Sequence, residues 1–261
     1  MVVRAGRRPA APPQPAPLVT VVIPVFNGAK YLGEAIESVL AQTYRPIDVV
    51  VVDDGSSDGS AAVARRFAAV RCCVQLHAGP GAARNRGVGL ARGRFLAFLD
   101  ADDVWTPEKL ERQMAALRAD PTRDMVLGHI RQFHSPDLDD AARRRLTGAG
   151  DVLAGFAAGT LLVERESFVR VGPFTTAGRV GEFIDWYARA MEHGLKSLML
   201  PEVVLLRRIH ATNTVIRERG ARTDYARILK ASLDRRRAKE APPGGAPCPA
   251  PPHPSPSPAR E

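Results

Sequence analysis

Between residues 18 and 99 the chain alternates short apolar runs with helix-like segments, and this alternation constrains the fold more than any other feature. Leu18–Ile23, Ile47–Val52 and Phe95–Leu99 are runs of strand length dominated by apolar, often β-branched, side chains. After the first run, residues 30–42 carry their apolar side chains on one stripe at helical spacing. Strands that alternate with helices predict an α/β fold with a mostly parallel, doubly wound sheet.

The remaining elements of this region are predicted from turn and capping residues. Helices are expected up to residue 67 and over 82–91, with a short strand near Val74 between them. A further helix is expected to start near residues 106–108, where Thr106 competes with Asp102 and Asp103 for the N-cap position ahead of Pro107.

Composition sets the expected domain boundaries. The chain has 261 residues, of which 45% are hydrophobic and 25% charged, which is typical of a globular protein with a sizeable core. Residues 18–118 and 119–238 are expected to be the two halves of one continuous domain, the second an α+β extension that ends in a basic helix. Residues 1–17 and 239–261 are rich in proline and are expected to be disordered tails.

The charge and the cysteines exclude several classes of protein. The net charge of +9 comes largely from arginines without interleaved aromatic residues, so no nucleic-acid partner is expected. Three cysteines, two of them adjacent, provide neither a disulfide framework nor a zinc site. These cysteines fit a reducing compartment, so a cytoplasmic location is expected. Because no apolar run approaches the roughly 20 residues of a membrane span, we expect no transmembrane segment. The basic helix leaves contact with a membrane surface open.

Three carboxylates follow the apolar run that ends at residue 99. Asp100, Asp102 and Asp103 would repel one another unless a cation lies between them, and hard oxygen ligands suit Mn²⁺ or Mg²⁺. In doubly wound sheets, ligands bind at the carboxyl ends of the strands, where Asp53 and Asp54 also fall. The sequence therefore predicts a metal site at this edge with a phosphate group beside it.

Two common nucleotide-binding loops are missing. The position after the first strand holds Pro24–Gly28 instead of Gly-x-Gly-x-x-Gly, and no Gly-Lys-Ser/Thr occurs anywhere in the chain. A dehydrogenase or a P-loop enzyme is therefore not expected. A nucleotidyltransferase is disfavoured as well, because the first loop is not glycine-rich and lacks a basic residue.

Four motifs in order carry a resemblance to a known family. Four segments resemble the successive motifs of family-2 glycosyltransferases: Val21–Asn27, Val51–Asp58, Ala83–Gly87 and Phe98–Trp105. The resemblance is specific over residues 18–118, the nucleotide-sugar-binding half, and looser up to about residue 215. It implies a GT-A fold and a metal-dependent transfer of a sugar from a nucleotide-sugar donor to an acceptor hydroxyl, with inversion of the anomeric configuration.

The resemblance assigns donor-binding roles in the first half. Backbone groups of Pro24, Val25 and Phe26 would border the nucleobase, and Asp54 would accept the imide hydrogen of uracil, which favours a UDP-sugar. The alternative for Asp54 is a helix cap within its Asp-Gly-Ser-Ser turn. Arg84 is favoured as the diphosphate ligand, since a basic group beside a helix N-terminus suits a diphosphate, although it could equally be an exposed helix residue.

The metal-binding roles also follow from the resemblance. Asp102 would be the direct metal ligand, with Asp100 near the ribose or in the water shell of the metal. His210 lies in a late Arg-x-His segment whose histidine closes over the metal and diphosphate. The alternative is that Asp102 or Asp103 caps the following helix.

The general base is the least defined part of the site. Glu182, Asp185 and Arg189 fall on one face of a predicted helix, which would also suit a solvated salt-bridge face. Family members usually have Glu-Asp here with the Asp as base, but Phe183 occupies that position. Glu182 is slightly preferred, Asp185 is the other candidate, and a base elsewhere stays open. Phe183 also keeps open a non-catalytic or weakly active sugar-nucleotide binding protein.

The acceptor-side half gives few signals. Residues 138–146, with three consecutive arginines, are expected to be a mobile loop near the acceptor entrance. The basic helix at about 221–239 is expected to pack through an apolar stripe. The acceptor itself, a glycan, a lipid-linked molecule or a polypeptide, is not specified.

Overall fold

A computed structural model describes residues 15–177, 180–211, 228, 230–235 and 237. The first half alternates strands and helices as the sequence predicts, and its elements end within a few residues of the predicted positions. In order they are β1 (Val19–Val25), α1 (Ala29–Leu40), β2 (Ile47–Asp53), α2 (Ser60–Arg65), β3 (Val70–Val74), α3 (Pro80–Leu90), β4 (Phe95–Phe98), β5 (Val104–Trp105) and α4 (Lys109–Ala119).

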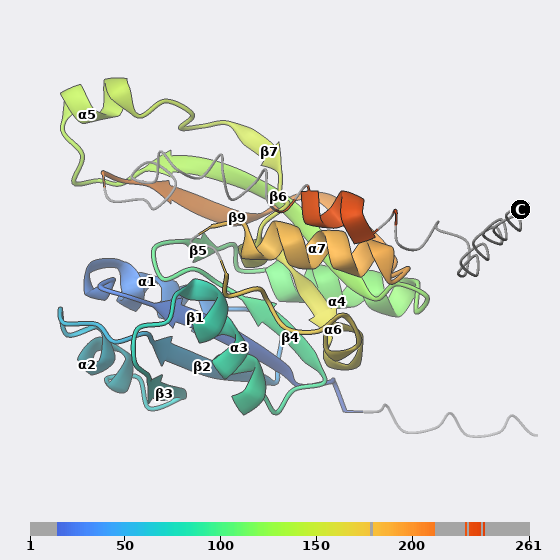
Figure 1. The fold of residues 1–261 in the computed structure, drawn as a ribbon. Coiled ribbons are helices and arrows are strands. Elements are labelled where there is room, and N and C mark those ends of the chain that lie inside the picture. The colour runs from blue at the N-terminus through green and yellow to red at the C-terminus, as the bar shows by residue number, and fades with distance from the viewer. Residues whose placement is uncertain (1–14, 178–179, 212–227, 229, 236, 238–261) are drawn as a thin grey trace, which may run out of the picture.

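The second half mixes long strands with short elements. Its elements are β6 (Met125–His134), α5 (Asp140–Arg145), β7 (Val152–Ala154), the 3₁₀ helix η1 (Ala158–Thr160), β8 (Leu162–Glu164), α6 (Arg165–Val171), α7 (Glu182–Glu192) and β9 (Ser197–Ile209). In Figure 1, β6, β7 and α5 extend away from the helices that cover the first half.

All these strands join one sheet in the order β3-β2-β1-β4-β8-β6-β9-β5, with β7 paired to β6. The first four strands of this order are parallel. Antiparallel pairs begin where β8 joins β4, although β6 and β9 run parallel to each other. The predicted parallel, doubly wound sheet with an α+β extension is confirmed.

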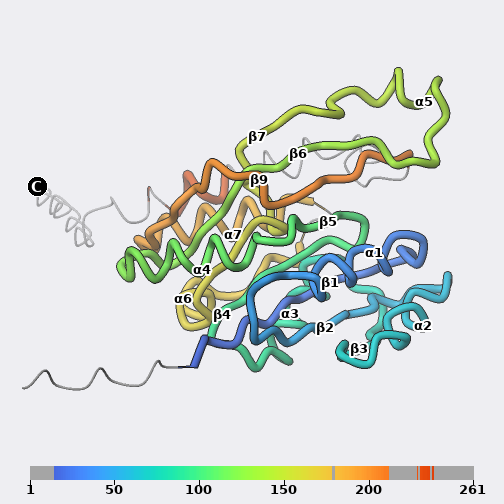
Figure 2. The backbone as a smooth tube through the Cα atoms, turned by 180° about the vertical axis from the view of Figure 1, so that it is seen from behind, coloured from blue at the N-terminus to red at the C-terminus, as the bar shows by residue number. Residues whose placement is uncertain are grey.

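Helices cover both faces of the sheet (Figures 1 and 2). Buried side chains of α1, α2 and α4 pack with alternate residues of β1 and β2 in one apolar core. On the opposite face, α6 and α7 pack against β4, β6 and β8 in a second core, and α3 covers β2. A strand buried on both faces must be apolar throughout, which explains the continuous apolar runs in the sequence.

Two local predictions are wrong. Helix α4 begins at Lys109 with Glu108 at the N-cap position, and the Thr106 hydroxyl donates instead to the carbonyl of Val203, because β5 brings this segment against β9. Residues 140–145, expected to be a loop, form α5, whose N-cap side chain Asp139 accepts from the Ala142 amide.

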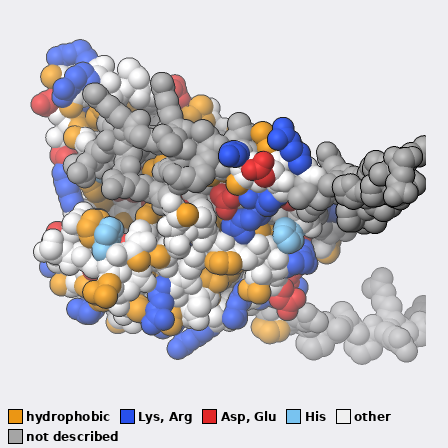
Figure 3. Space-filling model, in the orientation of Figure 1, with side chains coloured by type: hydrophobic (Ala, Val, Ile, Leu, Met, Phe, Trp, Pro, Cys, Tyr) orange, Lys and Arg blue, Asp and Glu red, His pale blue; other side chains and the backbone are white. Residues whose placement is uncertain are grey.

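The arginines of α5 lie on the surface in the last turn of that helix. Figure 3 shows the basic side chains of this face in separate groups, one of them over α5 at the upper left. The predicted basic helix over 221–239 and both predicted tails lie largely or wholly outside the described residues. Within the described part of the chain, no helix is both long and apolar enough to span a bilayer.

Candidate functional site

The acidic segment after β4 forms a tight turn that leads into β5. The amide of Asp103 donates to the carbonyl of Asp100 at 3.1 Å, which folds the segment back on itself. The Asp103 carboxylate is buried and accepts from the Arg208 amide on β9 at 2.9 Å. Burial first, and then the neighbouring carboxylates of Asp102 and Asp100, raise the pKa of Asp103 well above its ordinary value. Asp103 therefore anchors the turn to β9.

Asp102 and His210 meet at the end of β9. His210 Nε2 lies 2.9 Å from Asp102 Oδ2, and the imidazole is buried against the Tyr31 ring of α1 at a centroid distance of 4.8 Å. The Asp102 carboxylate is about one-third exposed. The structure thus brings together the two residues that the sequence predicted at the metal, although they are 108 positions apart.

Arg84 forms the centre of a second cluster. Its side chain is buried in α3 and donates through Nη2 to Asp100 and through Nη1 to Glu182. Burial lowers the pKa of the Arg84 guanidinium, but the two carboxylates outweigh it and raise the pKa above its ordinary value. Its third nitrogen, Nε, is buried and has no hydrogen-bond partner among the described residues. An unsatisfied guanidinium N–H beside a partly exposed carboxylate suits an anionic ligand.

A close backbone approach brings Glu182 to Arg84. A Cβ atom added to Gly81, in the first turn of α3, would lie 2.4 Å from the carbonyl oxygen of Thr175 and 3.7 Å from Glu182 Cβ. Only glycine allows the segment before α7 to pass so near to α3. Phe183, which the sequence resemblance aligned with the family's usual base, is buried in the core under α7.

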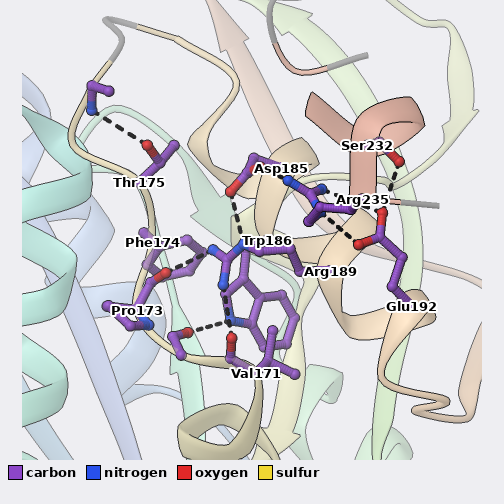
Figure 4. Close-up of polar contacts among 12 residues, drawn as sticks. Val171, Pro173, Phe174, Thr175, Asp185, Trp186, Arg189, Glu192, Ser232 and Arg235 are labelled. Atoms are coloured by element: carbon purple, nitrogen blue, oxygen red, sulfur yellow. Dashed lines mark hydrogen bonds and ion pairs between the residues drawn. The ribbon is translucent and has the colours of Figure 1, made fainter. Parts of the chain in front are cut away.

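Asp185 belongs to a different network (Figure 4). Its Oδ2 accepts from Arg189 Nε at 2.9 Å, and Arg189 also donates to the carbonyls of Val171 and Pro173. Arg235 Nη1 lies 3.7 Å from Asp185 Oδ1. Glu182, Asp185 and Arg189 were expected to act together on one face of α7. Instead, Asp185 and Arg189 connect α7 to the end of α6, and Glu182 pairs with Arg84.

Asp54 lies at the carboxyl end of β2 and is buried. Its carboxylate accepts from the amides of Ala78 and Gly79, at 2.9 and 2.8 Å, ahead of α3. The turn-capping role falls to Asp53 instead, whose Oδ1 accepts from the Ser56 amide at 2.7 Å. The three residues predicted to border a nucleobase differ in exposure. Pro24 and Val25 are buried in β1, and Phe26 is half exposed.

The sequence analysis missed two residues near the candidate site. His77 stacks on Phe26 with ring centroids 4.0 Å apart, and its Nδ1 lies 2.8 Å from the Asp54 carboxylate. Arg208 donates through Nε to the Asp102 carbonyl at 3.0 Å and lies over the Tyr31 ring. The Arg-x-His pattern could have drawn attention to Arg208. Nothing in the local sequence singled out His77.

The donor atoms at the acidic turn fit a small divalent cation. Among the described residues, no group of three His, Cys, Asp or Glu side chains is arranged to hold a metal ion. However, Mg²⁺ is typically held by one or two carboxylates together with substrate phosphates and water. Asp102 and His210 supply one oxygen and one nitrogen donor that face each other, with the half-exposed Asp100 carboxylate on the same turn.

Comparison with known proteins shows the family of the chain. The family model described as Glycosyl transferase family 2 matches residues 20–174, more than half of the chain, from β1 to the segment before α7. The chain belongs to glycosyltransferase family 2.

Curated relatives of this family member include two uncharacterised glycosyltransferases of Rickettsia. RP339 of Rickettsia prowazekii is 30% identical over 212 residues, and RT0329 of Rickettsia typhi is 29% identical over 219 residues. These alignments cover 76% and 78% of this chain and 66% and 68% of the relatives. The family-2 chain therefore spans about two thirds of the length of these relatives.

Solved structures support the fold. The crystal structure of S. aureus TarS matches with a TM-score of 0.60 at 19% identity, covering 73% of this chain and 36% of TarS. A structure of TarS 1–349 in complex with UDP-GlcNAc gives a TM-score of 0.60 at 19% identity, covering 75% of this chain and 59% of that one. At this identity the likeness establishes the GT-A-like fold, and the roles of individual residues depend on the geometry above.

Proposed function

We propose that this family-2 glycosyltransferase transfers a sugar from a UDP-sugar to an acceptor hydroxyl with the help of Mn²⁺ or Mg²⁺ and with inversion at the anomeric carbon. The observation that carries this proposal is the position of Arg84, whose buried guanidinium joins Asp100 to Glu182 and has one N–H without a partner among the described residues. A diphosphate at this point would meet a fixed positive charge beside a candidate base.

The donor side of the proposal depends on the loops after β1 and β2. Phe26 offers a half-exposed ring, and Asp54 offers a carboxylate that can accept the imide hydrogen of uracil. The TarS structures with UDP and UDP-GlcNAc add support, since they share this fold. A UDP-sugar is therefore the favoured donor.

Asp102 and His210 are the residues proposed to hold the divalent cation, with Asp100 beside it. When bound, the cation supplies positive charge that stabilises the departing diphosphate. Arg84 contributes a second positive charge from the protein itself, in a buried position where electrostatic interactions are strong.

Glu182 is the proposed general base. Its carboxylate takes the proton of the acceptor hydroxyl while the acceptor oxygen bonds to the anomeric carbon and the bond from that carbon to the diphosphate breaks. Attack on the face opposite the leaving group inverts the configuration. Asp185 is not favoured, because it pairs with Arg189 and Arg235, whereas Glu182 pairs with Arg84.

A second candidate function is nucleotide-sugar binding without turnover. Two observations favour it: Phe183 is buried where the family base would stand, and Glu182 is already paired with Arg84. In this case the cation and Asp102 would matter for binding, and Glu182 would not matter for chemistry.

A donor panel separates the two candidates. UDP-, GDP- and dTDP-sugars are incubated with the full chain and Mn²⁺, and nucleotide release is measured with and without EDTA. We expect metal-dependent release from UDP-sugars and a loss of at least about 10²-fold in Asp102→Asn. Asp120→Asn changes a partly exposed carboxylate just after α4; it is the matched control and should keep activity. Stronger release from a GDP- or dTDP-sugar would overturn the UDP assignment, and binding without release would favour the second candidate.

A further inference from the structure

The carboxylate of Asp54 has its acceptor positions filled by protein groups. Oδ1 accepts from Gln75 Nε2 at 2.7 Å and from the Ala78 amide at 2.9 Å. Oδ2 accepts from the Gly79 amide at 2.8 Å and lies 2.8 Å from His77 Nδ1. A carboxylate offers about four lone-pair sites, so a nucleobase imide can bind Asp54 only if one of these donors leaves.

His77 is the donor that can leave most easily, since of the two side-chain donors His77 is exposed and Gln75 is partly buried. The Ala78 and Gly79 amides belong to the backbone at the start of α3, so moving them would disturb the helix. The His77 side chain is 56% exposed, whereas that of Asp54 is 3% exposed. The second neighbour of His77 Nδ1 is the Asp54 carbonyl oxygen at 3.2 Å. Because both neighbours are acceptors, Nδ1 carries the hydrogen and donates it.

The His77 ring makes the two contacts expected of a uracil ring at this place. It donates an N–H to a buried carboxylate, and it stacks on Phe26 at a centroid distance of 4.0 Å with an interplanar angle of 26°. Stacking on an aromatic side chain and a hydrogen bond to an acidic acceptor are also how proteins recognise single nucleobases.

We propose that His77 occupies the place of the nucleobase in the ligand-free protein, and that the donor must displace it to bind. This inference depends on the proposed function, because it takes Phe26 and Asp54 as the nucleobase site. His77 then sets donor affinity: each binding event exchanges one stacked N–H donor for another, so the net gain from the nucleobase is small. Removing the imidazole should strengthen nucleotide binding.

Three variants of the full chain test this exchange by calorimetric titration with UDP and Mn²⁺, and with uridine alone. His77→Ala should bind about three- to tenfold more tightly than the wild type, the effect of removing one competing hydrogen bond. His77→Asn, which keeps an N–H donor but has no ring, should fall between the two. Leu76→Ala is the matched control, since Leu76 lies in the same loop and is 91% exposed, and it should bind as the wild type does.

A second measurement follows the His77 ring itself. In the wild type, its nuclear magnetic resonance signals should shift on addition of uridine as the ring leaves Phe26. Unchanged or weaker binding by His77→Ala, in a wild type that binds UDP, overturns this inference and leaves the proposed function intact. No UDP binding by the wild type, His77→Ala or His77→Asn overturns both.

Discussion

Residues 19–105 and residues 125–209 contribute strands to the same sheet, but the directions of those strands differ. In the first region β1, β2, β3 and β4 are all parallel, so the residue after each strand falls at one edge of the sheet. In the second region β8 runs antiparallel to both of its neighbours, and the site residues come from a helix start and a strand end. Position along the chain therefore indicates position in space only in the first region.

The two regions also hold their acidic residues differently. Asp54 and Asp103 accept from backbone amides, Asp54 from the segment ahead of α3 and Asp103 from β9. Glu182 and Asp185 are fixed by arginine side chains, which can exchange partners when an anion arrives. In the first region the two carboxylates are thus held by main-chain groups, whereas in the second region a ligand can change the pairing of the acids themselves.

The largest expected effect tests which acid of α7 takes part in chemistry. Glu182→Gln should lower kcat by about 10²- to 10⁴-fold, because the amide cannot accept the proton of the acceptor. Asp185→Asn should leave kcat within about tenfold and lower the free energy of unfolding by about 1–3 kcal/mol, because Arg189 loses a carboxylate partner. Steady-state kinetics and urea unfolding of both variants measure these effects.

This pair of variants is its own control, since the two acids are three residues apart on one helix. Loss of kcat in Asp185→Asn with normal activity in Glu182→Gln would reverse the assignment. It would also mean that α7 turns relative to α3 when the donor binds. Normal kcat in both variants would direct the search for a base to another element.

What the sequence predicted follows the same division. The alternation of apolar runs located β1, β2 and β4. The acidic segment and His210 were expected to lie together, and the contact between Asp102 and His210 agrees with this. The direction in which each α7 acid points was not predictable, because helical spacing places Glu182 and Asp185 together and only the approach of α3 at Gly81 separates them. Thr106 was misassigned for a similar reason, since β9 determines its partner.

A smaller effect tests how tightly α3 is packed in the first region. A Cβ atom on Gly87 would lie 2.2 Å from Val22 Cγ1 of β1, whereas one on Gly89, two residues later, would meet nothing within 4 Å. Gly87→Ala should therefore lower the free energy of unfolding by about 1–3 kcal/mol. Gly89→Ala should raise it by about 0.5–1 kcal/mol, because alanine favours the helix. Urea unfolding of both variants measures the difference, and equal effects would show that α3 can move away from β1.

A pH-dependent effect concerns Lys109, in the helix that connects the two regions. Its side chain is fully buried, donates to Gln113 Oε1 at 2.7 Å and lies 4.1 Å from the centre of the Trp105 ring. Burial lowers the pKa of Lys109 well below 10.5. Gln113 in turn donates to the carbonyls of Val126 and Thr160. Lys109 therefore supports, through Gln113, a contact between the two regions.

The lowered pKa of Lys109 gives a pH dependence with a definite sign. Between the folded pKa and 10.5 the unfolded chain binds a proton that the folded chain does not, so stability rises with pH in this window, by at most about 1.4 kcal/mol per pH unit. Lys109→Met removes this contribution. Urea unfolding at pH 7, 8.5 and 10 should therefore show the wild type gaining stability relative to Lys109→Met as pH rises, with no such gain relative to Lys196→Met, whose side chain is exposed. Parallel pH profiles of the free energy of unfolding for the wild type and Lys109→Met would mean that the buried amine stays protonated. The Trp105 ring and Gln113 would then stabilise a buried positive charge between the two regions.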